Sequence, residues 1–131
     1  MFDTSVLVND LRTGRYEERV QAAPGLVRLS AVVLAELWRG AGTAGERQLL
    51  VRMVKNQTVL TPTENNWLES GEILGRMRSE IGFPPEKLRD LHFDVLIALT
   101  ARSHGARLIT SNRADFEAIQ RYRKFNLEVW V

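Results

Sequence analysis

The chain has 131 residues, which suits one domain with a hydrophobic core of its own. It contains no cysteine, so a disulfide framework and a thiolate metal site are both excluded. No apolar run approaches the roughly 18 residues that a membrane helix needs, and the N-terminus lacks the features of a signal peptide, so we expect a cytoplasmic protein without membrane contact.

The basic side chains are mainly arginines, 15 against 3 lysines, and the isoelectric point is about 9.4 although the formal net charge is only +2. Arginine suits bidentate phosphate binding better than lysine does. This balance permits nucleic-acid binding, but on composition alone a solvated surface is the better explanation.

The first half of the chain alternates helical and extended patterns. Gly14 ends the first helical pattern, Pro24 and Gly25 end the second, and Ser30 is a suitable N-cap for the third. The predicted elements are helices over 5–12, 16–23, 31–41 and 46–55, and strands over 26–30 and 57–60.

The second half continues the alternation. Apolar residues spaced as on one helix face predict a long helix, a polar connection over 86–92 follows it, and the next segment is apolar nearly all round, which is typical of a buried helix ending at Gly105. The predicted elements are helices over 63–81, 93–103 and 113–122, and strands over 107–110 and 126–131.

Short strands separated by helices predict an α/β fold with a parallel sheet and right-handed connections. We see no internal repeat, no low-complexity segment and no second domain, so we expect one domain over residues 1–131.

Three acids and one amide stand near the ends of predicted strands. Asp3 follows the apolar N-terminal residues, and Asn112 follows the strand over 107–110. Glu36 is six residues into the helix after an earlier strand, and Asp94 opens the predicted buried helix. Functional groups of a parallel sheet gather beyond the carboxyl ends of its strands, so we expect these four side chains to lie close together.

Carboxylates that lie a few ångströms apart in a dry site raise one another's pKa, and a divalent cation removes this conflict. Oxygen ligands without cysteine suit Mg²⁺ or Mn²⁺. Such ions activate water and stabilise a phosphate leaving group, so the pattern favours phosphodiester hydrolysis.

Each of these residues also has a purely structural interpretation. Asp94 is equally a candidate N-cap, and Asn112 is a candidate cap for the helix after it, with Asp115 favoured by the helix dipole. Glu36 could pair with Arg39 on a solvated helix face, although its neighbours are apolar. Asp3 has the weakest structural interpretation, because a terminal strand needs no acid there.

Four segments of the sequence, in this order, resemble the PIN domain family, and more narrowly the VapC-type toxins of toxin–antitoxin pairs. They are Met1-Phe-Asp-Thr-Ser-Val-Leu7, Ser30-Ala-Val-Val-Leu-Ala-Glu36, Phe93-Asp-Val-Leu-Ile-Ala-Leu-Thr-Ala101 and Leu108-Ile-Thr-Ser-Asn-Arg-Ala-Asp-Phe116. The resemblance implies a three-layer α/β/α fold with a central parallel sheet. It also implies a metal-dependent endoribonuclease that acts on single-stranded RNA.

The resemblance also implies roles for single residues. Asp3, Glu36 and Asp94 match the family's acidic metal ligands, Asn112 falls at the fourth acidic position, and Asp115 is a nearby acid that could assist. Two hydroxyl positions that orient the acids match Thr4 and Thr110, and we expect a phosphate contact from Arg113.

Family members commonly form homodimers, and a cognate antitoxin usually covers the active site. One departure concerns the first strand, because only Met1 and Phe2 precede Asp3 where the family usually has several apolar residues. Either that strand is very short, or the natural start lies a few residues earlier.

Competing functions remain open. A catalytically silent PIN-like module would bind RNA or a partner without cutting, and the neutral Asn112 and the truncated first strand make it possible. A receiver-type phosphoacceptor domain also clusters acids, but no lysine ends a late strand to complete such a site. Structure-specific DNA cleavage is a further alternative, although the chain has no evident duplex-binding appendage.

Overall fold

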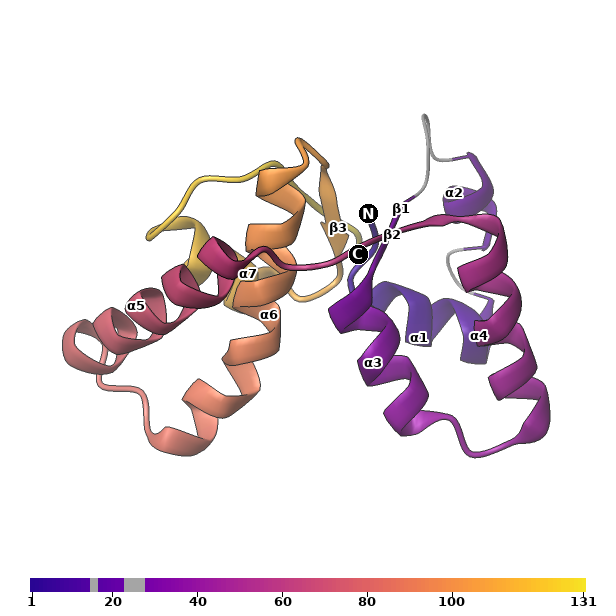
Figure 1. The fold of residues 1–131 in the computed structure, drawn as a ribbon, viewed down its shortest axis with the longest axis horizontal. Coiled ribbons are helices and arrows are strands. Elements are labelled where there is room, and N and C mark those ends of the chain that lie inside the picture. The colour runs from indigo at the N-terminus through magenta and orange to yellow at the C-terminus, as the bar shows by residue number, and fades with distance from the viewer. Residues whose placement is uncertain (15–16, 23–27) are drawn as a thin grey trace.

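The computed structural model describes residues 1–14, 17–22 and 28–131 (Figure 1). Helices and short strands alternate along it, as the sequence predicts. The elements are α1 (Thr4–Thr13), α2 (Glu17–Ala22), β1 (Arg28–Ser30), α3 (Ala31–Gly40), α4 (Ala44–Asn56), β2 (Thr58–Leu60), α5 (Glu64–Glu80), α6 (Pro85–Ser103), β3 (Leu108–Thr110), α7 (Arg113–Gln120) and β4 (Leu127–Val129).

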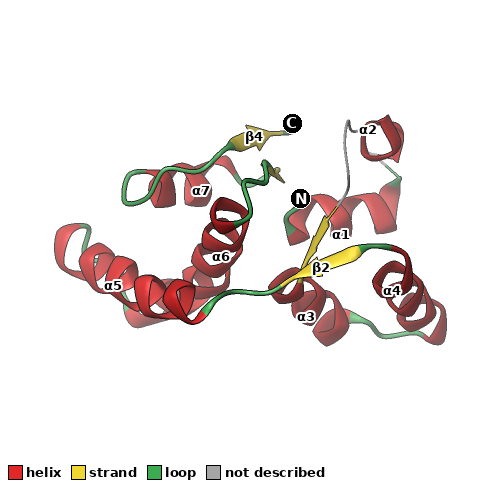
Figure 2. Ribbon diagram, turned by 45° about the horizontal axis from the view of Figure 1, so that its top comes forward, coloured by secondary structure: helices red, strands yellow, loops and turns green. Residues whose placement is uncertain are grey.

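All described strand pairings are parallel. Strand β1 pairs with β2, with Leu29 opposite Val59, and β3 pairs with β4, with Ile109 opposite Glu128. Figure 1 shows the N-terminus between β1 and β3. Figures 1 and 2 show helices to either side of the strands. This arrangement confirms the α/β class and agrees with the expected three-layer fold.

The first strand is reduced to a single parallel bridge between Phe2 and Ile109. Backbone hydrogen bonds hold it there: Ile109 N donates to Met1 O and Asp3 N donates to Ile109 O, both at 2.8 Å. Phe2 is buried and meets the ring of Trp130 edge-on, with the ring centroids 5.5 Å apart. These contacts fix the position of Asp3 even though so little strand precedes it.

Helix α6 is the centre of the hydrophobic core. It packs against α3, α5, α7 and β1, and this explains why its second half is apolar on every side. The buried side chains of α6 are Leu91, Val95, Leu96, Ile97, Ala98, Leu99, Thr100 and Ala101. No helix in the described ranges is long and apolar enough to cross a membrane.

Local capping explains several element boundaries. The Ser30 Oγ accepts hydrogen bonds from the backbone N–H groups of Val32 and Val33, as expected for an N-cap. Gly14 ends α1 with a φ of 67°, and Gly105 follows α6 with a φ of 62°, both in the left-handed region that favours glycine.

One predicted element is wrong. The segment 86–92 is not a connection, because α6 begins at Pro85 and runs without interruption to Ser103. Proline suits the first helical position, and the half-buried Leu88 and buried Leu91 extend the apolar face toward the N-terminus. Asp94 therefore lies in the middle of a helix, and it neither opens the helix nor caps it.

The other predicted elements are present, with ends that differ by at most two residues where the structure describes them. Parts of two predicted elements lie outside the described residues, namely residues 16 and 23–27. They belong to the ends of the predicted second helix, to its Pro24-Gly25 stop and to the start of the predicted strand over 26–30.

Candidate active site

Asp3 lies at the carboxyl end of the N-terminal strand segment and is buried. It precedes α1, but its side chain makes no capping hydrogen bond. Its Oδ2 instead accepts from Ser5 Oγ and from Thr110 Oγ1, each at 2.8 Å. Because both hydroxyls use Oδ2, the other carboxylate oxygen is left for a further ligand.

The two hydroxyls that bind Asp3 are themselves fixed by the backbone after β3. Ser5 Oγ accepts from Ser111 N at 3.2 Å, and Thr110 Oγ1 accepts from Asn112 N at 2.9 Å. The network joins residues more than a hundred positions apart in the sequence, so the orientation of Asp3 depends on the packing of α1 against β3.

Glu36 lies in the second turn of α3 and is half-buried. Its Oε1 accepts from Thr4 Oγ1 at 2.8 Å. Burial raises the pKa of Glu36, and the negative charge of Asp3 raises it further. The hydrogen bond from Thr4, which is the second largest effect, and the charge of Arg39 both lower this pKa. Glu36 is thus near Asp3 and is not part of a solvated helix face.

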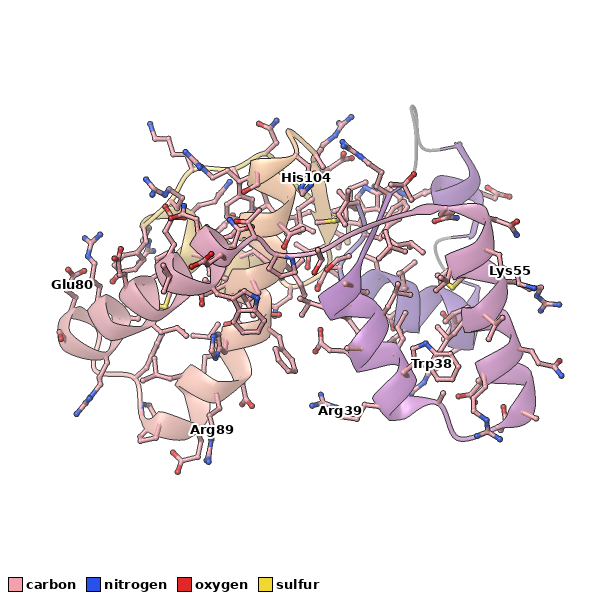
Figure 3. The ribbon with its side chains drawn as sticks, viewed as in Figure 1. Trp38, Arg39, Lys55, Glu80, Arg89 and His104 are labelled. Carbon is pink, nitrogen blue, oxygen red and sulfur yellow. The ribbon has the colours of Figure 1, made fainter. Side chains whose placement is uncertain are left out.

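The alternative ion pair between Arg39 and Glu36 is not formed among the described residues. Its guanidinium lies 5.8 Å from the ring centroid of Phe93 on α6. Figure 3 shows the Arg39 side chain extending from α3 toward α6. Arg39 therefore spans the two helices that carry Glu36 and Asp94.

Among the acids that the structure describes, Asp94 has the pKa that is raised furthest. Burial raises its pKa to about 8, the charges of Asp3, Glu36 and Asp115 add to this effect, and the charge of Lys87 opposes it. Asp94 accepts no hydrogen bond from any residue that the structure describes. It is a carboxyl group that faces other carboxylates without a donor, which is the situation that a bound cation relieves.

Asn112 caps α7, as its structural interpretation predicted. Its Oδ1 accepts from Asp115 N at 3.4 Å, and its Nδ2 donates to Asp115 Oδ2 at 3.0 Å. The Nζ of Lys87 donates to the other oxygen, Asp115 Oδ1, at 2.9 Å. Burial alone would raise the pKa of Asp115, but the hydrogen bonds from Lys87 and Asn112 and the charge of Lys87 hold it below its ordinary value.

Arg113 is exposed, and its Nη1 pairs with Glu117 Oε1 at 3.0 Å on the same helix face. The two histidines have hydrogen-bond partners other than the acids. His104 (Figure 3) lies at the end of α6, with its Nδ1 3.0 Å from Thr100 O. His92 Nε2 lies 3.2 Å from Ser70 Oγ.

The sequence does not predict two residues of the cluster, Ser5 and Lys87. A hydroxyl two residues after an acid at a helix start was a readable signal for Ser5. For Lys87 no such signal existed, because the segment around it was predicted to be a connection. Once α6 begins at Pro85, Lys87 falls two helical turns before Asp94.

The donor chemistry of Asp3, Glu36 and Asp94 fits a hard divalent cation, because all three supply carboxylate oxygens and their charges oppose one another. Within the described ranges, however, no three His, Cys, Asp or Glu side chains converge closely enough to form a complete metal site. The acids thus form an electrostatically coupled group whose side chains would have to draw together around an ion.

The chain matches the PIN domain family over residues 1–122, so it belongs to the PIN domain family. The fold is similar to that of VapBC-1 from nontypeable Haemophilus influenzae, with 25% identity, a TM-score of 0.74, and coverage of 99% of this chain and 96% of the other. None of the curated proteins matches this chain.

The fold is also similar to that of DNA-bound VapBC from Salmonella typhimurium, with 25% identity and a TM-score of 0.72. The match covers 100% of this chain and 97% of the other. A toxin–antitoxin complex from Klebsiella pneumoniae shares 26% identity, with a TM-score of 0.60 and 88% of each chain covered. The resemblance of the sequence to the PIN family, and to its VapC-type members, is therefore confirmed.

Proposed function

We propose that this protein is a metal-dependent endoribonuclease that cleaves single-stranded RNA and is the toxin of a toxin–antitoxin pair. The observation that carries the proposal is the mutual electrostatic effect of Asp3, Glu36 and Asp94, three acids from distant segments. Membership of the PIN family and the fold shared with VapBC proteins support it.

Asp3, Glu36 and Asp94 would hold Mg²⁺ or Mn²⁺, which when bound supplies an activated water and charge neutralisation at the phosphate. Thr110 holds Asp3 and Thr4 holds Glu36 in place through their hydroxyl groups. The catalytic set also includes Asn112, as an outer ligand, with Asp115 in support and Arg113 as the contact to an RNA phosphate.

We extend the proposal to assembly. Residues 1–131 act as one nuclease domain, the protein forms a homodimer, and a cognate antitoxin covers the acids. The similarity to VapBC proteins and to a toxin–antitoxin complex supports the antitoxin partner. Cytoplasmic location follows from an RNA substrate and an antitoxin made in the same cell.

The test is RNA cleavage by the Asp3→Asn and Asp94→Asn variants on a panel of single-stranded RNAs. Each variant keeps the size of the side chain, so the far-ultraviolet circular dichroism should stay unchanged while cleavage is abolished, as it should be with EDTA. If the variants and the EDTA-treated protein cut RNA as fast as the untreated protein does, the mechanism is wrong.

A silent PIN-like module that binds RNA or a partner is the second candidate. The neutral Asn112 and the absence of a complete metal site among the described residues favour it. Calorimetric titration with Mn²⁺ separates the two candidates. Lack of binding at millimolar Mn²⁺ would favour the silent module, whereas binding that Asp94→Asn abolishes favours the nuclease.

A further inference from the structure

A lysine side chain lies within the acidic cluster. Lys87 is in the first turn of α6, and its Nζ lies 2.9 Å from Asp115 Oδ1 in the first turn of α7. The two side chains are only 35% and 23% exposed, so water and salt screen this ion pair less than they screen a surface pair. Lys87 is therefore a positive charge fixed in one place.

Helix geometry places Lys87 on the same face of α6 as a proposed metal ligand. Seven residues separate Lys87 from Asp94, which is two turns of α6, and both side chains lie on nearly the same face. Lys87 and Asp115 both act electrostatically on Asp94, with opposite signs. The pair is thus part of the acidic cluster as well as a link between α6 and α7.

Asp115 has both carboxylate oxygens engaged. Oδ1 accepts from Lys87, and Oδ2 accepts from Asn112 Nδ2 at 3.0 Å. The amide oxygen of Asn112 is also engaged, because it accepts from the backbone N of Asp115. On this side of the cluster, the chain presents a neutral amide and a carboxylate whose charge is already neutralised.

We infer that the Lys87 ammonium takes the place of a second divalent cation, so that Asp3, Glu36 and Asp94 bind a single Mg²⁺ or Mn²⁺. The inference rests on the proposed function. Sites with two ions hold them about 3.5–4 Å apart, and so need carboxylate charge on both sides. Here the ammonium offsets the charge on one side, and it repels a further cation. Lys87 contacts Asp115 and not the ion, so it is a positioning residue.

The experiment counts the Mn²⁺ ions bound to the full chain without RNA, by electron paramagnetic resonance of free Mn²⁺ and by calorimetry. Lys87→Met removes the charge and keeps a long side chain, whereas Lys87→Arg keeps the charge. Arg107→Met is the matched control, because Arg107 pairs with Glu128 at 3.1 Å at the start of β3, at the opposite strand end from the acids. We expect one ion in the wild type, Lys87→Arg and Arg107→Met, and two in Lys87→Met.

Two ions bound to the wild type or to Lys87→Arg would overturn the inference, as would one ion bound to Lys87→Met with unchanged affinity. If Lys87→Met does not fold, the ions are counted on Lys87→Gln, which also removes the charge. Two ions together with metal-dependent RNA cleavage would overturn this inference alone. If the wild type binds no ion, the proposed metal dependence fails as well.

Discussion

The two acids at the centre of the cluster, Asp3 and Asp94, are held in opposite ways. Asp3 is buried and accepts two hydroxyl hydrogen bonds on one oxygen. Asp94 accepts none from the described residues, and burial together with neighbouring acids raises its pKa to about 8. Asp3 is therefore positioned by donors, whereas Asp94 is positioned only by its helix and is destabilised in its charged form.

The difference concerns the cost of burying each carboxylate. Donors around Asp3 lower the cost of burying a carboxylate, since a buried polar group with partners costs far less than one without. In the proposed nuclease, a bound cation would offset the cost of ionising Asp94. Three predictions test this contrast.

The largest effect concerns pH. The pKa of Asp94 is higher in the folded state than its ordinary value of 3.8 in the unfolded chain, so between about pH 4 and 8 the folded state binds the extra proton. Stability should therefore fall as pH rises through this window, by at most about 1.4 kcal/mol per pH unit from this group. Urea unfolding without divalent ions, at pH 5 to 8, measures the slope.

The control for this measurement is Asp94→Asn, which cannot ionise. Its slope should be clearly smaller than that of the wild type, and its stability at pH 8 should be higher. A residual slope of the same sign is expected from Glu36, whose pKa is also raised. Equal slopes in the two proteins would show that Asp94 ionises as easily as an exposed acid.

The second effect concerns the donors around Asp3. Asp3→Ala leaves the hydroxyl of the fully buried Thr110 without its acceptor, and should lower the free energy of unfolding by about 1–3 kcal/mol. Asp3→Asn keeps an acceptor oxygen and should cost clearly less. Chemical denaturation at pH 7 compares the two variants, and equal costs would contradict the role of the hydroxyl network.

The smallest effect on stability is expected at the exposed residue Arg113. Arg113 and Glu117 form an exposed i,i+4 pair, so Arg113→Ala should change the free energy of unfolding by no more than about 0.5 kcal/mol. If Arg113 contacts an RNA phosphate, the same variant should bind single-stranded RNA severalfold more weakly at low salt. Glu117→Ala is the control, because it breaks the pair but keeps the arginine. Unchanged RNA binding by Arg113→Ala would remove this residue from the proposed site.

Much of the fold could be predicted because its signals are local. Ser30 caps α3 through N–H groups two and three residues away, and Gly14 ends α1 within one turn. The prediction of a connection over 86–92 is wrong, because the charged residues of this segment outweigh Leu88 and Leu91 in the sequence pattern. In the structure both leucines pack in or against the core. Whether a polar segment continues a helix depends on what packs against it, and this is not a local property.

For the candidate site, the sequence by itself determined which residue types carry the chemistry and near which strand ends they stand. Asp3, Glu36, Asp94 and Asn112 could be named from their segments alone. Only the tertiary structure decided their environments. The contact of Thr110 with Asp3 and that of Lys87 with Asp115 span 107 and 28 residues of sequence. Hydrogen bonding, burial and ion pairing between such distant residues set the surroundings of each carboxyl group, because these effects depend on distances that only the packed chain defines.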